Sequence, residues 1–388
     1  MSLKISHQFD SGAIDVIQAT DASNIELNIR ADSHASDIAQ WFHFRLQGAR
    51  DVECTIRFLN AGKAMYPDGF EGYQVVASYD TENWFRVPTS FDGAVMTVNH
   101  MPEFDSVYYA YFEPYSWDRH LRLLGEVADH PHVRVLDIGS TVDGRDMNMV
   151  VVGSSEIDDI GNIETDDAKQ KIWIIARQHP GEAMAEWFVE GLLDALLDDA
   201  NPIAQKLLQK AVFYIVPNMN PDGAVQGNLR TNAAGANLNR EWMTPTLERS
   251  PEVLCVRTKM HEIGCDMFFD IHGDEALPYN FVAGNASLPN FTAADLAKEK
   301  NFVAQYIAAS PDFQNVHGYP IGEFEDTKLT LASGYVGHTF KCLALTLEMP
   351  FKDNADLPNA ETGWNGERSR KLGAALLQPI LHSLSLEK

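Results

Sequence analysis

Hydrophobic and polar residues alternate with a period of two along much of the first 116 residues. Phe42, Phe44 and Leu46 fill every second position of residues 41–46, as expected of a strand with one buried face. Similar runs rich in β-branched and aromatic residues occupy 53–58, 73–79 and 107–112, and Asp-Gly pairs mark turns between the strands. About eight short strands at this spacing predict an antiparallel β-sandwich over residues 1–116, and this region carries no catalytic constellation.

From residue 117 onward the period of the pattern changes. Continuous apolar runs alternate with segments of helical periodicity, which is typical of strands buried on both faces. The apolar runs are 171–176, 212–216, 267–271 and 342–347, and the helical segments are 118–128, 183–197, 251–263, 293–309 and 366–384. A hairpin is expected at 134–153, with its turn at Asp143-Gly144. This pattern predicts an α/β domain over residues 117–388.

Charge and cysteine content narrow the classes of partner and compartment. The chain has 388 residues, of which 30 are basic and 55 acidic, so its formal net charge is −25. Such a field repels phosphate backbones and anionic lipids, so we expect no nucleic acid and no membrane among the partners. No apolar run approaches the roughly 20 residues of a membrane helix. Four cysteines without a Cys-x-x-Cys pair, and a start without an apolar leader, predict a cytoplasmic protein.

Polar residues of metal-binding type follow two of the apolar runs. His179 and Glu182 come after the strand 171–176, and His272 comes after the strand 267–271. Each residue alone is weak evidence, because a single strand-end histidine more often makes an ordinary hydrogen bond. Ligands gather at the carboxyl ends of strands in open α/β sheets, however, and two histidines with one glutamate make a catalytic zinc set when water fills the fourth position.

Three further charged residues suit catalysis beside such a metal. Glu348 follows the strand 342–347, and a carboxylate there would accept a proton from a metal-bound water and pass it to a leaving amine. Arg230 and Arg240 lie in irregular segments rich in Asn and Gly that follow the strand 212–216. Because arginine presents a planar fork that matches carboxylates, both are candidates for holding an anionic group of a substrate.

The order of these motifs resembles that of the zinc metallocarboxypeptidases. The matching residues are His179-Pro-Gly-Glu182, Asn220-Pro-Asp-Gly223, Asn239-Arg240, His272 and Glu348. The chain is most similar to the cytosolic carboxypeptidase subgroup, including its bacterial members. That subgroup also carries a β-sandwich ahead of the catalytic domain, so the likeness covers nearly the whole chain and implies a mixed central sheet flanked by helices.

The resemblance also implies a role for each matching residue. His179, Glu182 and His272 would bind one zinc ion per chain, and Glu348 would act first as general base and then as general acid. Arg230 would polarise the scissile carbonyl, while Asn239 and Arg240 would hold the C-terminal carboxylate of a peptide or protein partner. This implies a zinc-dependent exopeptidase that hydrolyses a C-terminal peptide or isopeptide bond.

Two departures from the family pattern stand out. Asn237 occupies a position where many relatives carry an aspartate that orients a zinc-binding histidine. The tyrosine that closes over the substrate has no secure match, and Tyr335 is the best candidate.

Substrate preference and two rival functions stay open at this stage. Relatives in the subgroup remove C-terminal glutamates or similar residues, so the resemblance suggests a preference for acidic residues. That preference needs a basic group in the side-chain pocket, for which Lys328 and Lys341 are candidates. The rivals are a zinc-dependent amidase or deacylase on the same scaffold and a non-catalytic peptide-binding module. The module would be expected to have lost Glu348. The sequence gives no indication of an oligomeric state.

Overall fold

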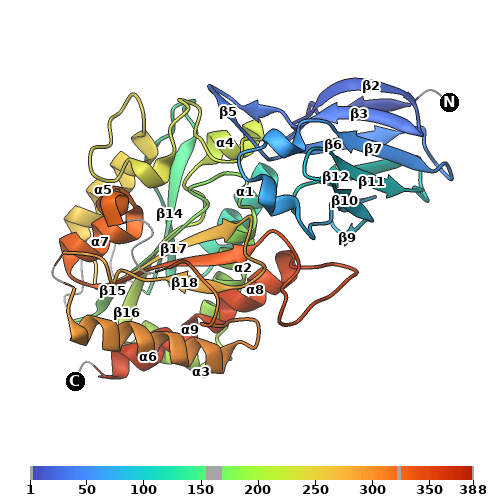
Figure 1. Ribbon diagram of the computed structural model, residues 1–388. Helices are drawn as coiled ribbons and strands as arrows, with labels where there is room; N and C mark the ends of the chain where they lie inside the picture. The colour runs from blue at the N-terminus through green and yellow to red at the C-terminus, as the bar shows by residue number, and fades with distance from the viewer. Residues whose placement is uncertain (1–2, 154–167, 290, 321–324, 387–388) are drawn as a thin grey trace.

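The computed structural model describes residues 3–153, 168–289, 291–320 and 325–386. Figure 1 shows a β-rich part near the N-terminus at one end of the molecule and a larger part of mixed helices and strands at the other. The last strand of the β-rich part ends at Ala110, and the first helix of the larger part begins at Trp117. Among the helices that the structure describes, none combines the length and apolar character needed to cross a bilayer.

The N-terminal part is a sandwich of two five-stranded sheets, with strand orders β1-β6-β12-β8-β9 and β10-β11-β7-β3-β2. A short pair, β4-β5, extends from it. The strands are β1 (Lys4–Ser6), β2 (Asp15–Asp21), β3 (Asn24–Asn28), β4 (Ala31–Asp32), β5 (Ala35–Ala39), β6 (His43–Gln47), β7 (Cys54–Phe58), β8 (Val76–Ser78), β9 (Trp84–Arg86), β10 (Thr89–Phe91), β11 (Met96–His100) and β12 (Ser106–Ala110).

The predicted sandwich is confirmed, with two corrections. It contains more than the expected eight strands, because several, such as β8, span only three residues and are too short to give a periodic signal. The pairing is also not purely antiparallel, since β3 and β7 run parallel. His43, which alternates with Phe42 and Phe44 in the strand pattern, is also buried, and its ring packs edge-on against Phe9 with the ring centroids 4.9 Å apart.

The larger part is built on a seven-stranded mixed sheet of order β13-β14-β16-β15-β17-β19-β18. The four strands β16, β15, β17 and β19 run parallel, whereas β13, β14 and β18 are antiparallel to their neighbours. The strands are β13 (Val133–Ser140), β14 (Asp146–Val152), β15 (Gln170–Ala176), β16 (Ala211–Val216), β17 (Met267–Asp274), β18 (Phe281–Ala283) and β19 (Leu343–Pro350). The parallel strands are the four apolar runs of the sequence, as predicted.

Helices cover both faces of this sheet. They are α1 (Trp117–Ala128), α2 (Met184–Leu196), α3 (Pro202–Leu208), α4 (Pro221–Gln226), α5 (Pro251–Ile263), α6 (Ala293–Ala309), α7 (Ala332–Phe340), α8 (Gly366–Ala375) and α9 (Leu377–Leu386). The single helix predicted at 366–384 is instead two helices. Pro379 explains the break, since its ring clashes with a carbonyl one turn earlier and it has no N–H to donate.

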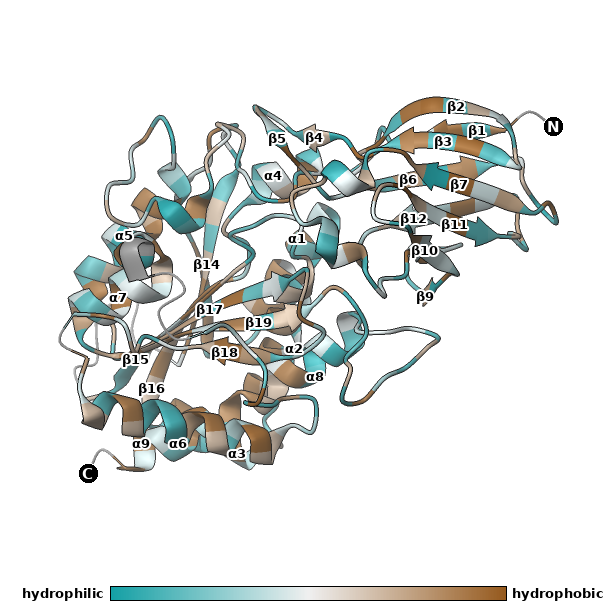
Figure 2. Ribbon diagram, viewed as in Figure 1, coloured by the Kyte–Doolittle hydropathy of each residue, from teal (hydrophilic) through white to brown (hydrophobic). Residues whose placement is uncertain are grey.

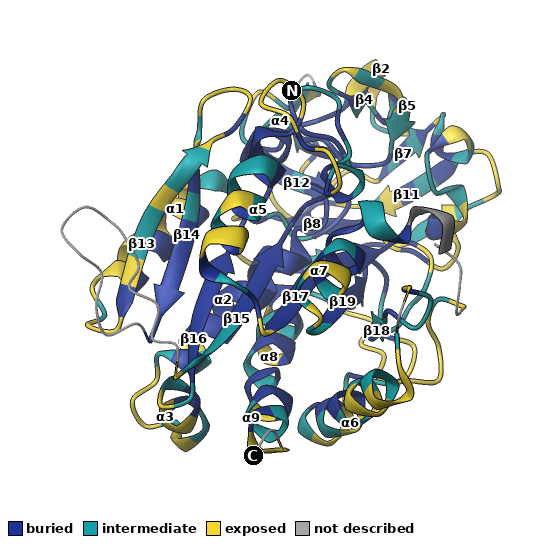
Figure 3. Ribbon diagram, turned by 90° about the vertical axis from the view of Figure 1, so that its left-hand side faces the viewer, coloured by how far each residue is buried: buried dark blue, intermediate teal, exposed yellow. Residues whose placement is uncertain are grey.

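Alternate residues of the central strands serve two hydrophobic cores. Ile172 and Ile174 face the core formed with α2, α8 and α9, whereas Trp173 and Ile175 face the core formed with α5 and α7. This explains the continuous apolar runs, because both faces of each strand are covered. The central strands are brown in Figure 2 and dark blue in Figure 3, which marks them as hydrophobic and buried.

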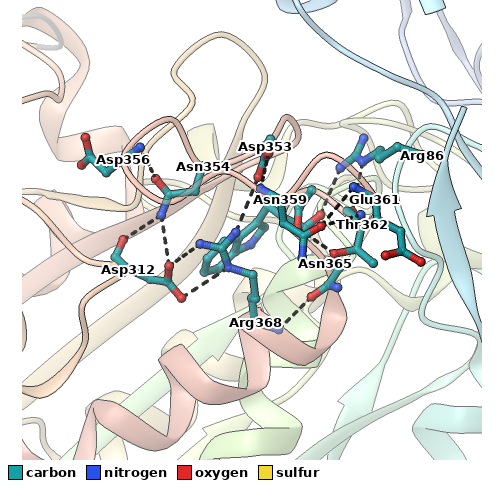
Figure 4. A network of polar contacts seen from close by, with 12 residues as sticks. Arg86, Asp312, Asp353, Asn354, Asp356, Asn359, Glu361, Thr362, Asn365 and Arg368 are labelled. Carbon is teal, nitrogen blue, oxygen red and sulfur yellow. Dashed lines mark hydrogen bonds and ion pairs between the residues drawn. The ribbon is translucent and has the colours of Figure 1, made fainter. Parts of the chain in front are cut away.

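The sandwich packs directly on the larger part. Its Tyr111 stacks on Phe351 with ring centroids 4.6 Å apart. Arg86 of β9 donates hydrogen bonds to the backbone carbonyls of Phe351, Thr362 and Trp364. Figure 4 shows Arg86 at the edge of a polar network that also contains Asp312 and Arg368, which form an ion pair. The two parts therefore share one continuous core.

Candidate active site

His179, Glu182 and His272 meet where two neighbouring parallel strands end. His179 Nδ1 lies 2.7 Å from Glu182 Oε1, and His272 Nδ1 lies 2.8 Å from Glu182 Oε2. The three side chains are 4%, 1% and 2% exposed. Because β15 pairs with β17 up to Ala176 and Ile271, their following residues are brought to the same edge of the sheet. The predicted set of three is therefore assembled.

The other nitrogen of each imidazole is held by an oxygen atom. His179 Nε2 lies 3.0 Å from Asn237 Oδ1, and His272 Nε2 lies 2.9 Å from Asp270 Oδ2. Such partners orient metal-binding histidines, so both Nδ1 atoms face Glu182. Potential ligand atoms of the three residues all lie within 4.8 Å of one another. Two imidazoles and one carboxylate with this orientation fit a zinc ion that keeps an open fourth position.

Electrostatics keeps His179 in the form that binds metals. Burial, and after it the nearby charge of Arg230, lower the pKa of His179 to about 3. A neutral imidazole has a free lone pair for a metal ion, so His179 is ready to bind without first losing a proton.

A buried arginine supports the turn between the first two ligands. The Arg177 guanidinium donates to the Pro180 carbonyl oxygen over 2.9 Å and to Glu186 Oε2 over 2.7 Å. Arg177 itself adopts a φ of +60°, which few non-glycine residues do. The sequence analysis missed this residue. The sequence does place Arg177 directly after the apolar run 171–176, and this position could have marked it as a residue near the site.

Glu348 faces the same site from β19. It lies opposite His272 in the register of β17 and β19 and is 6% exposed. Its Oε2 atom is buried and has no hydrogen-bond partner within the described part of the chain. Burial raises the pKa of Glu348 well above its ordinary value. A carboxylate that readily takes a proton is suited to general base catalysis.

A cavity of about 500 Å³ opens over these residues. Residues from both parts of the molecule line it, including His179, Glu182, His272, Glu348, Arg230, Asn239, Arg240, Tyr66, Glu275, Tyr319, Lys328 and Thr346. The cavity lies at the carboxyl ends of the parallel strands, where the candidate residues were expected to gather. Tyr66 belongs to the sandwich, and no motif in the sequence pointed to it.

The three residues predicted to bind substrate or polarise its carbonyl are brought together in this cavity. Asn239 and Arg240 lie on a short helical turn, η3 (Leu238–Arg240), and Asn239 Oδ1 accepts a hydrogen bond from Ala332 N over 2.8 Å. Arg240 lies close enough to Arg230 that burial and the charge of Arg230 both lower its pKa. Two neighbouring cations favour an anionic group between or beside them.

Tyr335 lies outside this cavity. Its hydroxyl is 2.8 Å from His261 Nε2 on α5, and its ring packs near Trp242. This position is inconsistent with the predicted contact between Tyr335 and a substrate. Tyr319 lines the cavity instead, and its hydroxyl donates to Asp274 Oδ2 over 2.6 Å. Tyr319 lies in an irregular segment, where neither periodicity nor a motif marks it.

The two candidate lysines also lie in different places. Lys328 lines the cavity on the turn η4 (Glu325–Thr330), is 6% exposed, and donates from Nζ to the Gly284 carbonyl oxygen over 3.0 Å. Lys341 follows α7 and lines a separate cavity with Cys342. Lys328 alone of the two lies near the proposed metal ligands.

A fold with a mixed sheet and a His₂Glu set beside a buried glutamate and two arginines defines a metallocarboxypeptidase, which is a peptide hydrolase. Residues 121–362 match the family described as zinc carboxypeptidase, and residues 5–112 match the domain described as the cytosolic carboxypeptidase N-terminal domain. The chain belongs to the zinc carboxypeptidase family.

Solved structures and sequence relatives agree with this assignment. A metallo-carboxypeptidase from Burkholderia cenocepacia is 55% identical, with a TM-score of 0.95 and full coverage of both chains. A metallo-carboxypeptidase from Pseudomonas aeruginosa is 45% identical, with a TM-score of 0.92, covering 98% of this chain and 100% of the other. Cytosolic carboxypeptidase 6 of Mus musculus is 26% identical over 71% of this chain. The match covers 54% of that mouse protein.

Proposed function

We propose that this metallocarboxypeptidase uses one zinc ion, held by His179, Glu182 and His272, to remove the C-terminal residue of peptides. Zinc in that position supplies a Lewis acid for the peptide carbonyl and a water molecule of lowered pKa. The observation that carries the proposal is that the His₂Glu set, Glu348 and two arginines line one cavity, and that Glu348 Oε2 has no hydrogen-bond partner among the residues that the structure describes.

The side chains of the cavity have separate tasks in this proposal. Glu348 takes a proton at Oε2 and returns it to the leaving amine. Arg230 donates to the oxygen of the scissile carbonyl as negative charge develops there. Asn239 and Arg240 bind the terminal carboxylate, and Tyr319, rather than Tyr335, closes the cavity beside it. A terminal carboxylate between these groups restricts cleavage to the last residue of a chain.

The variant Glu348→Gln tests the catalytic assignment. We expect it to bind zinc as the parent does, because Glu348 is not a ligand, and to lose at least about 100-fold in kcat, the usual scale of general base catalysis. Zinc content by atomic spectroscopy and release of the last residue by chromatography are the two measurements. Undiminished turnover would remove Glu348 from this role. Rapid cleavage of acylated amino acids without cleavage of peptides would favour the amidase alternative.

We further propose that the side-chain pocket prefers acidic residues, on the strength of Lys328. A buried ammonium group in the cavity that holds the substrate favours a carboxylate opposite it. The P. aeruginosa relative was solved in complex with (2-guanidinoethylmercapto)succinic acid. This compound carries two carboxylates and one cationic guanidino group, so its binding to that relative does not bear on the charge of the side-chain pocket here. The compartment we propose is the cytoplasm, in keeping with four free cysteines in the described structure.

Matched lysine variants test the acidic preference. The substrates are peptides that differ only in a final Glu, Gln or Leu. We expect Lys328→Gln to lower the ratio of kcat/KM for Glu over Gln by at least about tenfold, or about 1.4 kcal/mol. Lys341→Gln is the control, since Lys341 lines a different cavity, and should keep the parental ratio. A parent enzyme that prefers Leu would contradict the proposal.

A further inference from the structure

The segment that carries Arg230 is held by a carboxylate from the N-terminal sandwich. Asp32 of β4 accepts hydrogen bonds from the backbone N–H groups of Leu229, Arg230 and Thr231, over 2.6, 2.8 and 2.9 Å. The Thr231 hydroxyl donates a fourth bond over 3.0 Å. Asp32 is 5% exposed, so these donors take the place of water around a buried charge.

Three consecutive N–H groups on one carboxylate fix the backbone of this segment. Oδ1 accepts from Leu229, and Oδ2 accepts from both Arg230 and Thr231. Both oxygens must therefore be acceptors, which an amide side chain cannot provide. Charge-assisted bonds of this kind are stronger than neutral ones and hold a narrow geometry.

The sandwich also contacts the side chain of Arg230. The guanidinium carbon lies 5.4 Å from the centre of the Tyr66 ring, a cation–π contact. The Nε atom of Arg230 is buried and makes no hydrogen bond with any residue that the structure describes. The backbone of residue 230 and the Tyr66 ring therefore both help to place the guanidinium.

We propose that Asp32 is a positioning residue for catalysis, which acts by holding Arg230 at the scissile carbonyl. The inference rests on the role proposed above for Arg230. An oxyanion donor acts only within a narrow range of distance, and a displacement of about 1 Å can cost about 100-fold in rate. The sandwich then helps to position a catalytic residue, although Asp32 itself does not touch the substrate.

The variant Asp32→Asn is the main test, and Arg30→Ala is its control. Arg30 lies two residues away and donates across the same interface, from Nη2 to the Gln226 carbonyl oxygen over 2.6 Å. We expect Asp32→Asn to lower kcat about 10- to 100-fold while KM changes less than about threefold. The reason is that the bond from Arg230 to the carbonyl oxygen is made mainly in the transition state. Arg30→Ala should stay within about twofold of the parent in kcat.

A double variant separates positioning from general destabilisation. If Asp32 acts through Arg230, then Asp32→Asn should cost less than about twofold in an Arg230→Met background. Thermal unfolding and circular dichroism establish that each variant is folded. Should Asp32→Asn fail to fold, Thr231→Val removes only the hydroxyl contact with Asp32 and should still lower kcat several-fold.

Three results would overturn the inference. These are a folded Asp32→Asn variant with kcat within about twofold of the parent, equal losses with and without the Arg230 side chain, and an equal loss in Arg30→Ala. If the role proposed for Arg230 is itself wrong, the result is different, because Arg230→Met by itself would then leave kcat unchanged.

Discussion

The two histidines of the site differ in the oxygen atom that their outer nitrogen faces. His272 faces the carboxylate of Asp270, whereas His179 faces the amide oxygen of Asn237. A carboxylate accepts more strongly and makes the imidazole a more basic ligand than an amide does. With an amide at residue 237, His179 is therefore expected to bind the proposed zinc ion less tightly than it would with an aspartate there.

The variant Asn237→Asp should tighten zinc binding. We expect the zinc Kd to fall by about tenfold, the scale on which such partners act. The new carboxylate can also keep the hydrogen bond that Asn237 Oδ1 accepts from Asn239 N over 3.1 Å. Competition with a chromogenic chelator at pH 7.5 measures the Kd, with Asn237→Ala as a variant that should bind zinc more weakly. An unchanged or higher Kd in Asn237→Asp would contradict this reasoning.

At the scale of elements, helix α4 fixes the distance between two loops of the site. Asn220 caps the helix, accepting from Gly223 N over 3.1 Å. A Cβ atom at Gly223 would lie 2.5 Å from the Thr231 carbonyl oxygen and 2.7 Å from Pro180 Cγ. Gly223 thus lets the turn that carries His179 and the segment that carries Arg230 approach each other.

The variant Gly223→Ala should disturb both loops. Alanine favours helices over glycine by about 1 kcal/mol, but the collision with backbone outweighs this gain. We expect a loss of stability of about 1–3 kcal/mol together with a fall in kcat/KM. Urea unfolding and steady-state kinetics measure the two effects. Gly125→Ala on the exposed face of α1, where nothing lies within 4 Å, is the control and should be neutral or stabilising.

At the scale of the whole molecule, the segment between the two parts carries a half-buried carboxyl group. Glu113 accepts a hydrogen bond from Gly366 N over 2.8 Å, at the start of α8. Burial raises the pKa of Glu113 to about 7, against which the bond from Gly366 acts only in part. The folded protein therefore keeps a proton that the unfolded chain releases at lower pH.

This raised pKa predicts a pH dependence of stability with a definite sign. Below about pH 4.5 the carboxyl group of Glu113 is protonated in both the folded and the unfolded protein, so its titration does not change the stability. Between about 4.5 and 7 only the folded state holds it, so its contribution to stability falls as the pH rises. Glu113→Gln should therefore melt near the parental temperature at pH 4.5 and several degrees higher at pH 8. Thermal scans measure this, with the exposed Glu103→Gln as control. A constant difference across the range would contradict the argument.

The pattern of hydrophobic and polar residues predicted the secondary structure best where a strand is buried on both faces. The four parallel strands lie close to their expected positions because both faces of each are covered. The pattern failed at Pro379, where one periodic apolar segment is two helices, and in the sandwich, where three-residue strands leave no period to detect. The assignment of Tyr335 came from the family resemblance and not from this pattern, and it does not fit because α7 places the Tyr335 hydroxyl beside His261.

The sequence by itself determined the order of the elements and the residue types of the proposed metal set, because periodicity and strand-end position are local properties of the chain. Only the tertiary structure decided which side chains meet. Tyr66, Asp32 and Lys328 lie far from Arg230 in the sequence, yet Tyr66 and Lys328 line its cavity and Asp32 holds its segment. Such contacts depend on how segments that are distant in the sequence pack together, and packing is fixed by shape and burial summed over the whole molecule.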